Sequence, residues 1–290
     1  VGSEMCIRDR LLASPDAVVF GSNKGNISAI SLSTGKLMWK SVWTTSDGET
    51  WVLPVLSGHQ GVLCIGDPIG MSRGSPNKIG LVYDTKLKYL SLDTGEEIWQ
   101  TTGGTLAEVQ LKEFPGGGYL GDIHATEAFG KLYVVIGHTL SAISEDSGNL
   151  VWQQTLTGKL ETLKVLDNQH LIVVNSKAPG ATSLSVLDAH MGQVINKYEL
   201  GEGARFFVFS NPEIGMVYVL AKRVDKKAEI PWFITDVYRL DVNEDEEVIL
   251  IQTVYEDVLH FDAKMETILS ATVEEDETVF CMQKVGKDGY

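Results

Sequence analysis

A twelve-residue segment centred on a glycine recurs along the chain, and this recurrence constrains the fold more than any other feature. Four copies align without gaps: residues 28–39 (SAISLSTGKLMW), 88–99 (KYLSLDTGEEIW), 141–152 (SAISEDSGNLVW) and 185–196 (SVLDAHMGQVIN). A fifth, residues 238–249 (YRLDVNEDEEVI), keeps the register with Asp245 in the glycine place. The aligned positions are spaced by 60, 53, 44 and 53 residues: Gly35, Gly95, Gly148, Gly192 and Asp245. A four-stranded repeat unit takes about 40–50 residues, so each copy predicts one such unit.

Each copy predicts a β-hairpin. Apolar residues such as Ile30 and Leu32 alternate into a turn of the form (D/S)-(T/S)-G, and a second strand follows with Leu37 and Trp39. Glycine tolerates the positive φ of such a turn, and an Asp or Ser side chain can bond its own backbone across it. A β-rich strand precedes each hairpin, at residues 17–21, 81–84, 132–136, 170–175 and 216–220. We therefore expect an all-β fold, a β-propeller of four-stranded antiparallel blades that forms an incomplete ring of five to six blades.

Tryptophan recurs four residues after three of the glycines, at Trp39, Trp99 and Trp152. Each ring either wedges between adjacent blades, where it buries much area, or serves as a stacking platform for a ligand. Because one ligand site would not require a tryptophan on three blades, we favour the structural interpretation.

The two ends of the sequence differ from the repeats. Residues 1–10 (VGSEMCIRDR) fit no repeat, and we interpret them as a non-native or assembly-derived segment. The propeller then occupies residues 11–290. Residues 259–262 and 278–283 predict two further strands, and residues 286–290 (GKDGY) an unfinished turn. We expect an incomplete propeller with a gap between its first and last blades.

The charge balance excludes some partner classes. The chain carries 39 acidic and 24 basic residues, a net charge of -15, which disfavours nucleic acid and anionic lipid surfaces. No apolar run approaches the ~20 residues that span a bilayer. Apart from Cys6 in the atypical N-terminus, Cys64 and Cys281 stand far apart and predict neither a disulfide framework nor a zinc site.

Three segments interrupt the repeat: residues 66–80, 103–122 and 221–234. Long loops on a rigid scaffold often carry binding, although surface insertions without a function fit equally well. The third segment places Trp232 and Phe233 near Arg223 and three lysines in an otherwise acidic chain. Aromatic and Arg residues anchor many interfaces, so we predict Arg223, Trp232 and Phe233 as a candidate protein contact. The alternative is an inter-strand extension whose Trp232 packs on its own blade.

The hairpins resemble the repeat of pyrroloquinoline-quinone (PQQ)-like propellers, an alternating strand followed by T/S-G-x-x-x-W. Three copies carry this ending in full, the fourth has Asn196 for Trp, and the fifth lacks both Gly and Trp. The resemblance covers about residues 17–251 and implies the propeller fold. It leaves function open, because the repeat serves enzymes, assembly factors and scaffolds. The N-terminal layout is a TG-x-x-x-W hairpin, a spacer with a strand such as Gly58–Ile65 and then a degenerate second blade. In this layout the chain is similar to the lumenal propeller of the largest subunit of the endoplasmic-reticulum (ER) membrane protein complex.

No motif in the sequence predicts catalysis. The resemblance to quinoprotein dehydrogenases implies a vicinal cysteine pair and a calcium site, and Cys64 and Cys281 are not vicinal. The six histidines form no H-x-x-x-H pair, and Asp122 and His124 lack an accompanying nucleophile motif. We expect no catalytic, cofactor-binding or metal-binding residues, and no cofactor.

Three functions are compatible with these observations. We favour a non-catalytic scaffold that binds other protein subunits of a membrane-protein insertion or biogenesis complex, on the lumenal face of the ER membrane. The second is a bacterial outer-membrane assembly factor in the periplasm, and the third a PQQ-dependent oxidoreductase. A C-terminal transmembrane helix, a lipobox or a vicinal cysteine pair in the full-length reading frame would distinguish them in that order.

Overall fold

The computed structural model describes residues 11–21, 25–43, 51–57, 61–67, 82–83, 86–101, 109–110, 124–136, 138–177, 181–200, 205–211, 215–225, 232–242, 248–255, 257–274 and 277–285. Within these ranges all regular structure is β-strand, with no helix. The chain divides into two compact units, Val1–Thr155 and Leu156–Tyr290.

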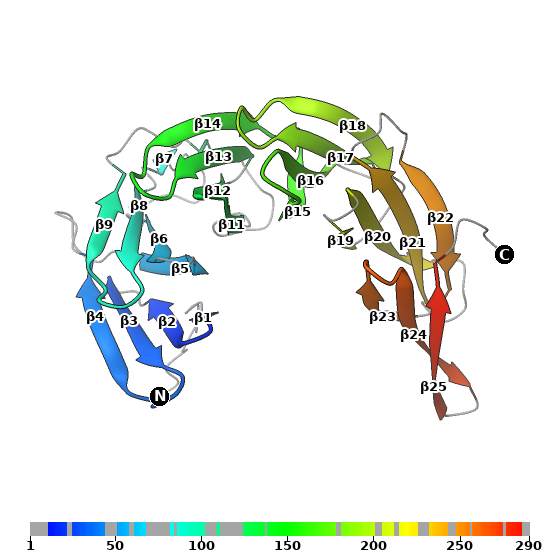
Figure 1. Ribbon diagram of the computed structural model, residues 1–290, viewed down its shortest axis with the longest axis horizontal. Helices are drawn as coiled ribbons and strands as arrows, with labels where there is room; N and C mark the ends of the chain where they lie inside the picture. Colours follow the sequence, from blue (N-terminus) through cyan, green and yellow to red (C-terminus); the bar gives the residue numbers. More distant parts are fainter. Residues whose placement is uncertain are drawn as a thin grey trace, which may run out of the picture. The chain divides into compact units, whose positions relative to one another are not determined.

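The first unit contains three antiparallel four-stranded sheets (Figure 1). The first sheet has the order β1 (Leu11–Ala13), β2 (Ala17–Gly21), β3 (Asn26–Ser31), β4 (Leu37–Val42). The second has the order β5 (Trp51–Ser57), β6 (Gly61–Asp67), β8 (Lys86–Ser91), β9 (Glu97–Gln100). The third has the order β11 (His124–Ala128), β12 (Lys131–Ile136), β13 (Thr139–Ser144), β14 (Leu150–Thr155). A separate two-stranded sheet pairs β7 (Val82–Tyr83) with β10 (Val109–Gln110).

The second unit contains two more four-stranded sheets and one sheet of three described strands. The fourth sheet has the order β15 (Lys159–Val165), β16 (His170–Lys177), β17 (Ala181–Asp188), β18 (Val194–Leu200). The fifth has the order β19 (Arg205–Asn211), β20 (Met216–Asp225), β21 (Trp232–Asp241), β22 (Ile249–Val254). The sixth has the order β23 (Asp257–Asp262), β24 (Thr267–Glu274), β25 (Glu277–Lys284). Strands that follow one another in sequence are neighbours in each sheet except the second, where β6 pairs with β8 and the intervening β7 lies in the separate two-stranded sheet. The predicted all-β architecture of four-stranded antiparallel blades is confirmed.

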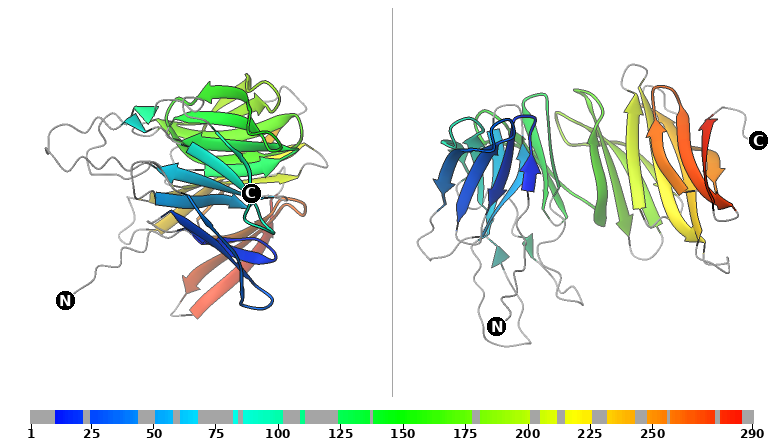
Figure 2. Two further views of the ribbon diagram at one scale, coloured as in Figure 1. Left: turned by 90° about the vertical axis from the view of Figure 1, so that its left-hand side faces the viewer. Right: turned by 90° about the horizontal axis from the view of Figure 1, so that it is seen from below.

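The hydrophobic core lies between successive sheets, which stack face to face within each unit (Figure 2). One cluster joins the first and second sheets through residues such as Val19, Trp39 and Leu90. Equivalent clusters join the second sheet to the third, the fourth to the fifth, and the fifth to the sixth. A β-sheet with two apolar faces must be covered on both sides, which is why the middle strands read as nearly continuous apolar runs.

A bulge recurs at one place in five sheets, between the third strand and the outer strand. The register shifts at Ala29/Ile30, Tyr89/Leu90, Ala142/Ile143, Val186/Leu187 and Val237/Tyr238. A bulge bends the strand and increases its twist, so each outer strand curves at an equivalent point. The residue just before each register shift pairs across the ladder with a residue of the outer strand. In chain order these partners are Trp39, Trp99, Trp152, Asn196 and Gln252.

The fifth hairpin is longer than the ungapped alignment predicts. Ala29 pairs with Trp39, ten residues later, whereas Val237 pairs with Gln252, fifteen residues later. The residue that corresponds to Trp39 is therefore Gln252, and the alignment of Ile249 with the tryptophans is wrong. Asp245 lies outside the described residues. The missing glycine and tryptophan left no marker in the sequence from which the longer connection could be detected.

Two further expectations need correction. Residues 81–84 were expected to lie beside the second hairpin, but Val82 and Tyr83 pair with β10, and β6 is the neighbour of β8. Residues 221–234 were expected to interrupt the repeat, but residues 221–225 and 232–234 continue the β20–β21 ladder. The other expected strands are present: residues 259–262 lie in β23 and residues 278–283 in β25. Residues 1–10, 68–80, 111–123 and 286–290 lie outside the described residues.

Candidate functional site

The four repeat glycines occupy turn positions that require a left-handed backbone. Gly35, Gly95, Gly148 and Gly192 have φ values of 65°, 71°, 68° and 71°. The amide of Gly35 donates to the carbonyl oxygen of Ser31, at 2.9 Å, and the other three make the same contact. The side chain that bonds across the turn lies four residues before the glycine. Asp188 Oδ1, for example, accepts from the amides of His190 and Met191 at 2.7 Å.

The repeat tryptophans are buried, and two of them dock on the glycine turn of the following sheet. Trp39 Nε1 donates to the carbonyl oxygen of Leu92 at 2.6 Å, and Trp99 Nε1 to that of Glu145 at 2.5 Å. The ring of Trp39 covers Gly95, and that of Trp99 covers Gly148. Trp152 is equally buried, and its ring lies 6.0 Å from that of Tyr133. For Trp39 and Trp99, both the ring face and the indole N–H are thus engaged within the protein.

A tyrosine–glutamate hydrogen bond adds a polar link between sheets. The Tyr89 hydroxyl donates to Glu145 Oε1 at 2.6 Å, and both residues are buried. Tyr218 on β20 donates in the same way to Glu266 in the turn between β23 and β24. Burial, followed by the hydrogen bond to the glutamate, raises the pKa of both hydroxyls above the ordinary tyrosine value. Each tyrosine therefore acts as a neutral donor.

Of the three predicted interface residues, the structure describes only the side chain of Arg223. Its Nε donates to Asp236 Oδ2 at 2.9 Å, and Thr253 Oγ1 donates to the other carboxyl oxygen, also at 2.9 Å. Trp232 and Phe233 begin β21, and their side chains lie outside the described part of the chain. Arg223 thus ties together β20, β21 and β22 through Asp236 and Thr253.

Exposed apolar residues recur at the start of the outer strand in five sheets. These side chains are Leu37 and Met38 on β4, Ile98 on β9, Leu150 and Val151 on β14, Val194 and Ile195 on β18, and Ile249 and Leu250 on β22. We call them the outer-strand apolar residues. An isolated exposed apolar residue is normal, whereas these residues recur at one position of the repeat.

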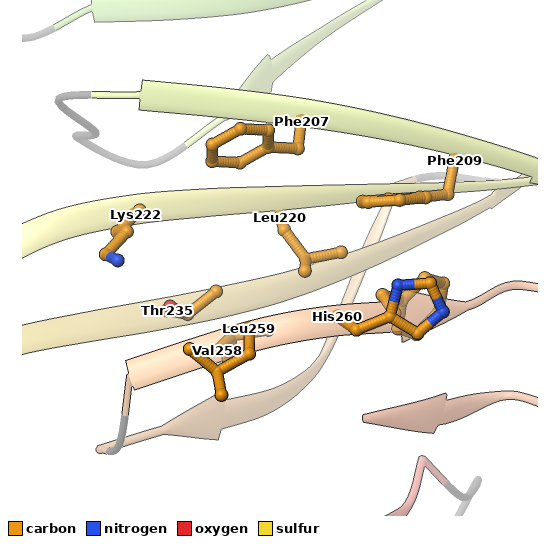
Figure 3. Close-up of a pocket in the computed structure, with 9 residues that line it drawn as sticks. Phe207, Phe209, Leu220, Lys222, Thr235, Val258, Leu259 and His260 are labelled. Carbon is orange, nitrogen blue, oxygen red and sulfur yellow. The ribbon is translucent and has the colours of Figure 1, made fainter. Parts of the chain in front are cut away.

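A small cleft opens between the fifth and sixth sheets of the second unit (Figure 3). It has a volume of about 90 Å³ and is lined by Phe207, Phe209, Leu220, Lys222, Thr235, Val258, Leu259, His260 and Phe261. We call it the β19–β23 cleft. Thr235 is 2% exposed, and its Oγ1 is buried without a hydrogen-bond partner.

The described residues offer little redox or metal chemistry. Cys64 and Cys281 are free, and burial raises the pKa of the Cys64 thiol to about 12, which keeps it protonated. Among the described residues no group of three or more His, Cys, Asp and Glu is placed to hold a metal ion. His170 pairs instead with the Asp167 carboxyl, 2.9 Å away. His124 lies on β11, while Asp122 is outside the described ranges.

Sequence reasoning did not identify the outer-strand apolar residues or the β19–β23 cleft. The outer-strand apolar residues had a visible signal, because apolar residues stand between the glycine and the tryptophan in every full copy of the repeat. The β19–β23 cleft had only a weak signal in the sequence, which is the pair of phenylalanines at the alternate positions 207 and 209. Which blade faces a strand, and how well the two fit, is decided by tertiary packing.

Comparison with known proteins supports the fold. Residues 84–222, slightly under half of the chain, match the family described as "Outer membrane protein assembly factor BamB". A comparison with curated proteins gave no significant match.

Two solved structures are similar in fold over most of this chain. BamB from Moraxella catarrhalis has a TM-score of 0.50 at 11% identity, over 96% of this chain and 70% of that one. Quinohemoprotein alcohol dehydrogenase ADHIIG from Pseudomonas putida HK5 has a TM-score of 0.50 at 12% identity, over 91% and 55%.

No helix with the length and hydropathy of a membrane span occurs in the described part of the chain. The blade-by-blade topology, the family match over residues 84–222 and the structural similarities together identify the fold as a β-propeller built from PQQ-like repeats.

Proposed function

We propose that the chain is a non-catalytic propeller scaffold that binds other subunits of a membrane-protein biogenesis complex. The observation that carries this proposal is the recurrence of the outer-strand apolar residues. An outer strand that faced only solvent would be expected to carry polar residues at its exposed positions. Here the first two residues of five outer strands are exposed, and nine of the ten are apolar.

The repeat tryptophans support a scaffold rather than an enzyme. A ring that stacks on a cofactor needs a free face and a cavity of matching size. Trp39 and Trp99 instead cover glycine turns, and their indole N–H groups are bonded to backbone carbonyls. These residues act in blade packing, so the Gly-x-x-x-Trp ending of the motif serves stability.

The repeat type supports the proposed cellular setting. Similarity to a family described as an outer-membrane assembly factor supports a role in membrane-protein assembly on an exocytoplasmic face. The degenerate motifs and the N-terminal layout favour the ER lumen and a role like that of the largest subunit of the ER membrane protein complex. The bacterial periplasm is the second candidate, and the family match itself favours it.

The test is to replace outer-strand apolar residues and measure both partner recovery and stability. Val151→Ser and Ile195→Ser should each reduce the complex subunits that co-purify with the full-length protein. The melting temperature should stay unchanged, because exposed substitutions usually alter stability by less than about 0.5 kcal/mol. Phe129→Ser is the matched control, since Phe129 is 61% exposed but lies in the β11–β12 turn.

Unchanged recovery with Val151→Ser and Ile195→Ser, or equal loss with Phe129→Ser, would contradict the scaffold surface. Alcohol oxidation by the purified protein with added PQQ and calcium would contradict the non-catalytic assignment.

A further inference from the structure

The β19–β23 cleft is open, mostly apolar and large enough for one side chain. Phe207 and Leu259 are 46% and 52% exposed at its mouth, while Leu220 and Phe261 are buried at its floor. Small-molecule sites typically measure roughly 300–1,000 Å³, well above the volume of about 90 Å³ found here. A space of this size suits one branched or aromatic side chain rather than a whole cofactor.

The cleft also contains an unsatisfied polar group. A buried hydroxyl without a hydrogen-bond partner costs free energy, so native proteins rarely retain one without a reason. Thr235 is one of the residues that line the cleft (Figure 3), and its Oγ1 is buried and lacks a hydrogen-bond partner. A bound segment that offers a backbone or side-chain acceptor would satisfy it.

Basic residues lie along the same edge of the cleft. Arg205 pairs with Lys222 across β19 and β20, and Lys222 pairs with Thr235 across β20 and β21. Directly opposed residues in an antiparallel ladder project from the same face of the sheet, so the three form one row. None of the described residues that line the cleft is acidic. This local charge is opposite to the net charge of -15 for the chain.

We propose that the β19–β23 cleft binds a short segment of a partner polypeptide in which a bulky apolar residue stands next to an acidic one. The apolar side chain fills the cleft between Phe207 and Leu259, the carboxylate faces the exposed Arg205, and Thr235 donates to the segment. Repulsion from the acidic remainder of the chain is screened beyond about 8 Å at physiological salt, so Arg205 dominates at contact. This inference rests on the proposed scaffold function, because it names the chemistry of one partner contact.

The probe for this site is a fluorescein-labelled peptide, Gly-Ser-Asp-Phe-Glu-Ser-Gly, titrated with the purified chain and followed by fluorescence anisotropy. Replacing its Phe by Ser, or its two acidic residues by Lys, should weaken binding by about tenfold. Phe207→Ala should weaken binding of the original peptide by about tenfold, and Thr235→Val by about fivefold, which is the range of one hydrogen bond. Phe280→Ala on β25 is the matched control, since Phe280 is 64% exposed outside the cleft, and it should leave affinity unchanged.

Several results would overturn the inference. They are no binding at millimolar peptide, equal binding of the Lys peptide, or unchanged affinity in Phe207→Ala. Phenylacetate binding as tightly as the peptide would instead identify a small-molecule site. If any of these occurred while Val151→Ser still lost co-purifying subunits, the cleft assignment would fail and the scaffold function would stand.

Discussion

The indole ring of Trp39 lies directly on Gly95, the turn glycine of the next sheet. A Cβ atom at Gly95 would come within 2.5 Å of ring atoms Cδ2 and Cε3 of Trp39. Trp99 and Gly148 repeat this relationship, with the corresponding approach at 2.6 Å. Gly95 and Gly148 therefore each have two functions. Each allows a positive φ, and each leaves room for the tryptophan of the preceding blade.

Gly95→Ala and Gly35→Ala separate these two functions. Both positions have positive φ, but a Cβ at Gly35 would meet nothing within 4 Å. We expect Gly35→Ala to lower the free energy of unfolding by about 1 kcal/mol through backbone strain alone. Gly95→Ala should cost about 1–3 kcal/mol more, because it displaces a buried ring. Urea unfolding measures both, and equal losses would show that Trp39 does not pack on Gly95 as described.

The Tyr89–Glu145 hydrogen bond predicts a loss of stability in alkaline solution. The pKa of Tyr89 is raised in the folded state, so its contribution is fully present below the unfolded value of about 10 and is lost as pH rises beyond it. Tyr89→Phe should lower the free energy of unfolding by about 2 kcal/mol at neutral pH, because the buried Glu145 carboxyl loses a donor. The variant should also show a weaker decline above pH 10. Identical pH slopes for the two proteins would argue against this coupling.

Valine substitution of Thr235 on β21 and of Thr253 on β22 should change the free energy of unfolding in opposite directions. Thr235→Val removes a buried hydroxyl without a partner and should raise the free energy of unfolding by about 1 kcal/mol. Thr253→Val removes the donor to Asp236 and should lower it by about 1 kcal/mol. Thermal and urea unfolding of both variants provide the comparison. A loss of stability in Thr235→Val would mean that its hydroxyl is satisfied in solution.

Arg223 should prove to be a structural residue. Arg223→Ala leaves the Asp236 side chain, only 9% exposed, without its cation. The free energy of unfolding should fall by about 2 kcal/mol, less than for a fully buried pair because Arg223 is itself 37% exposed. Adding Asp236→Asn should restore part of the loss. If Arg223→Ala left stability intact and abolished co-purification of partners, the original interface prediction would be correct instead.

The repeat pattern was sufficient to predict the blades because each copy carries its own turn chemistry. Gly35 and Trp39 mark a turn and an outer strand within one short segment, so the prediction needs no long-range information. The fifth hairpin shows the limit of this reasoning. Once Gly and Trp are replaced, nothing local fixes the loop length, and the true counterpart of Trp39 is Gln252.

The candidate sites depended on relationships that the sequence does not display. Arg223 looked like an interface anchor because it is basic in an acidic chain, but its partner Asp236 lies across a hairpin. The β19–β23 cleft requires β23 to face β19 and β20, and only the packing of two blades determines that contact. Local patterns thus predict elements, whereas sites between elements require the fold.

The most direct test of the scaffold function is photo-crosslinking from the outer strands. The photoreactive residue p-benzoylphenylalanine would replace Met38 or Ile195, two outer-strand apolar residues, in the full-length protein within its native membranes. The same residue at Asp16 or Asn168, exposed turn positions of the first and fourth sheets, provides the control. The scaffold function predicts discrete adducts with subunits of one membrane complex from positions 38 and 195, and few from positions 16 and 168. Equal adduct yields at all four positions, or none at 38 and 195, would contradict it.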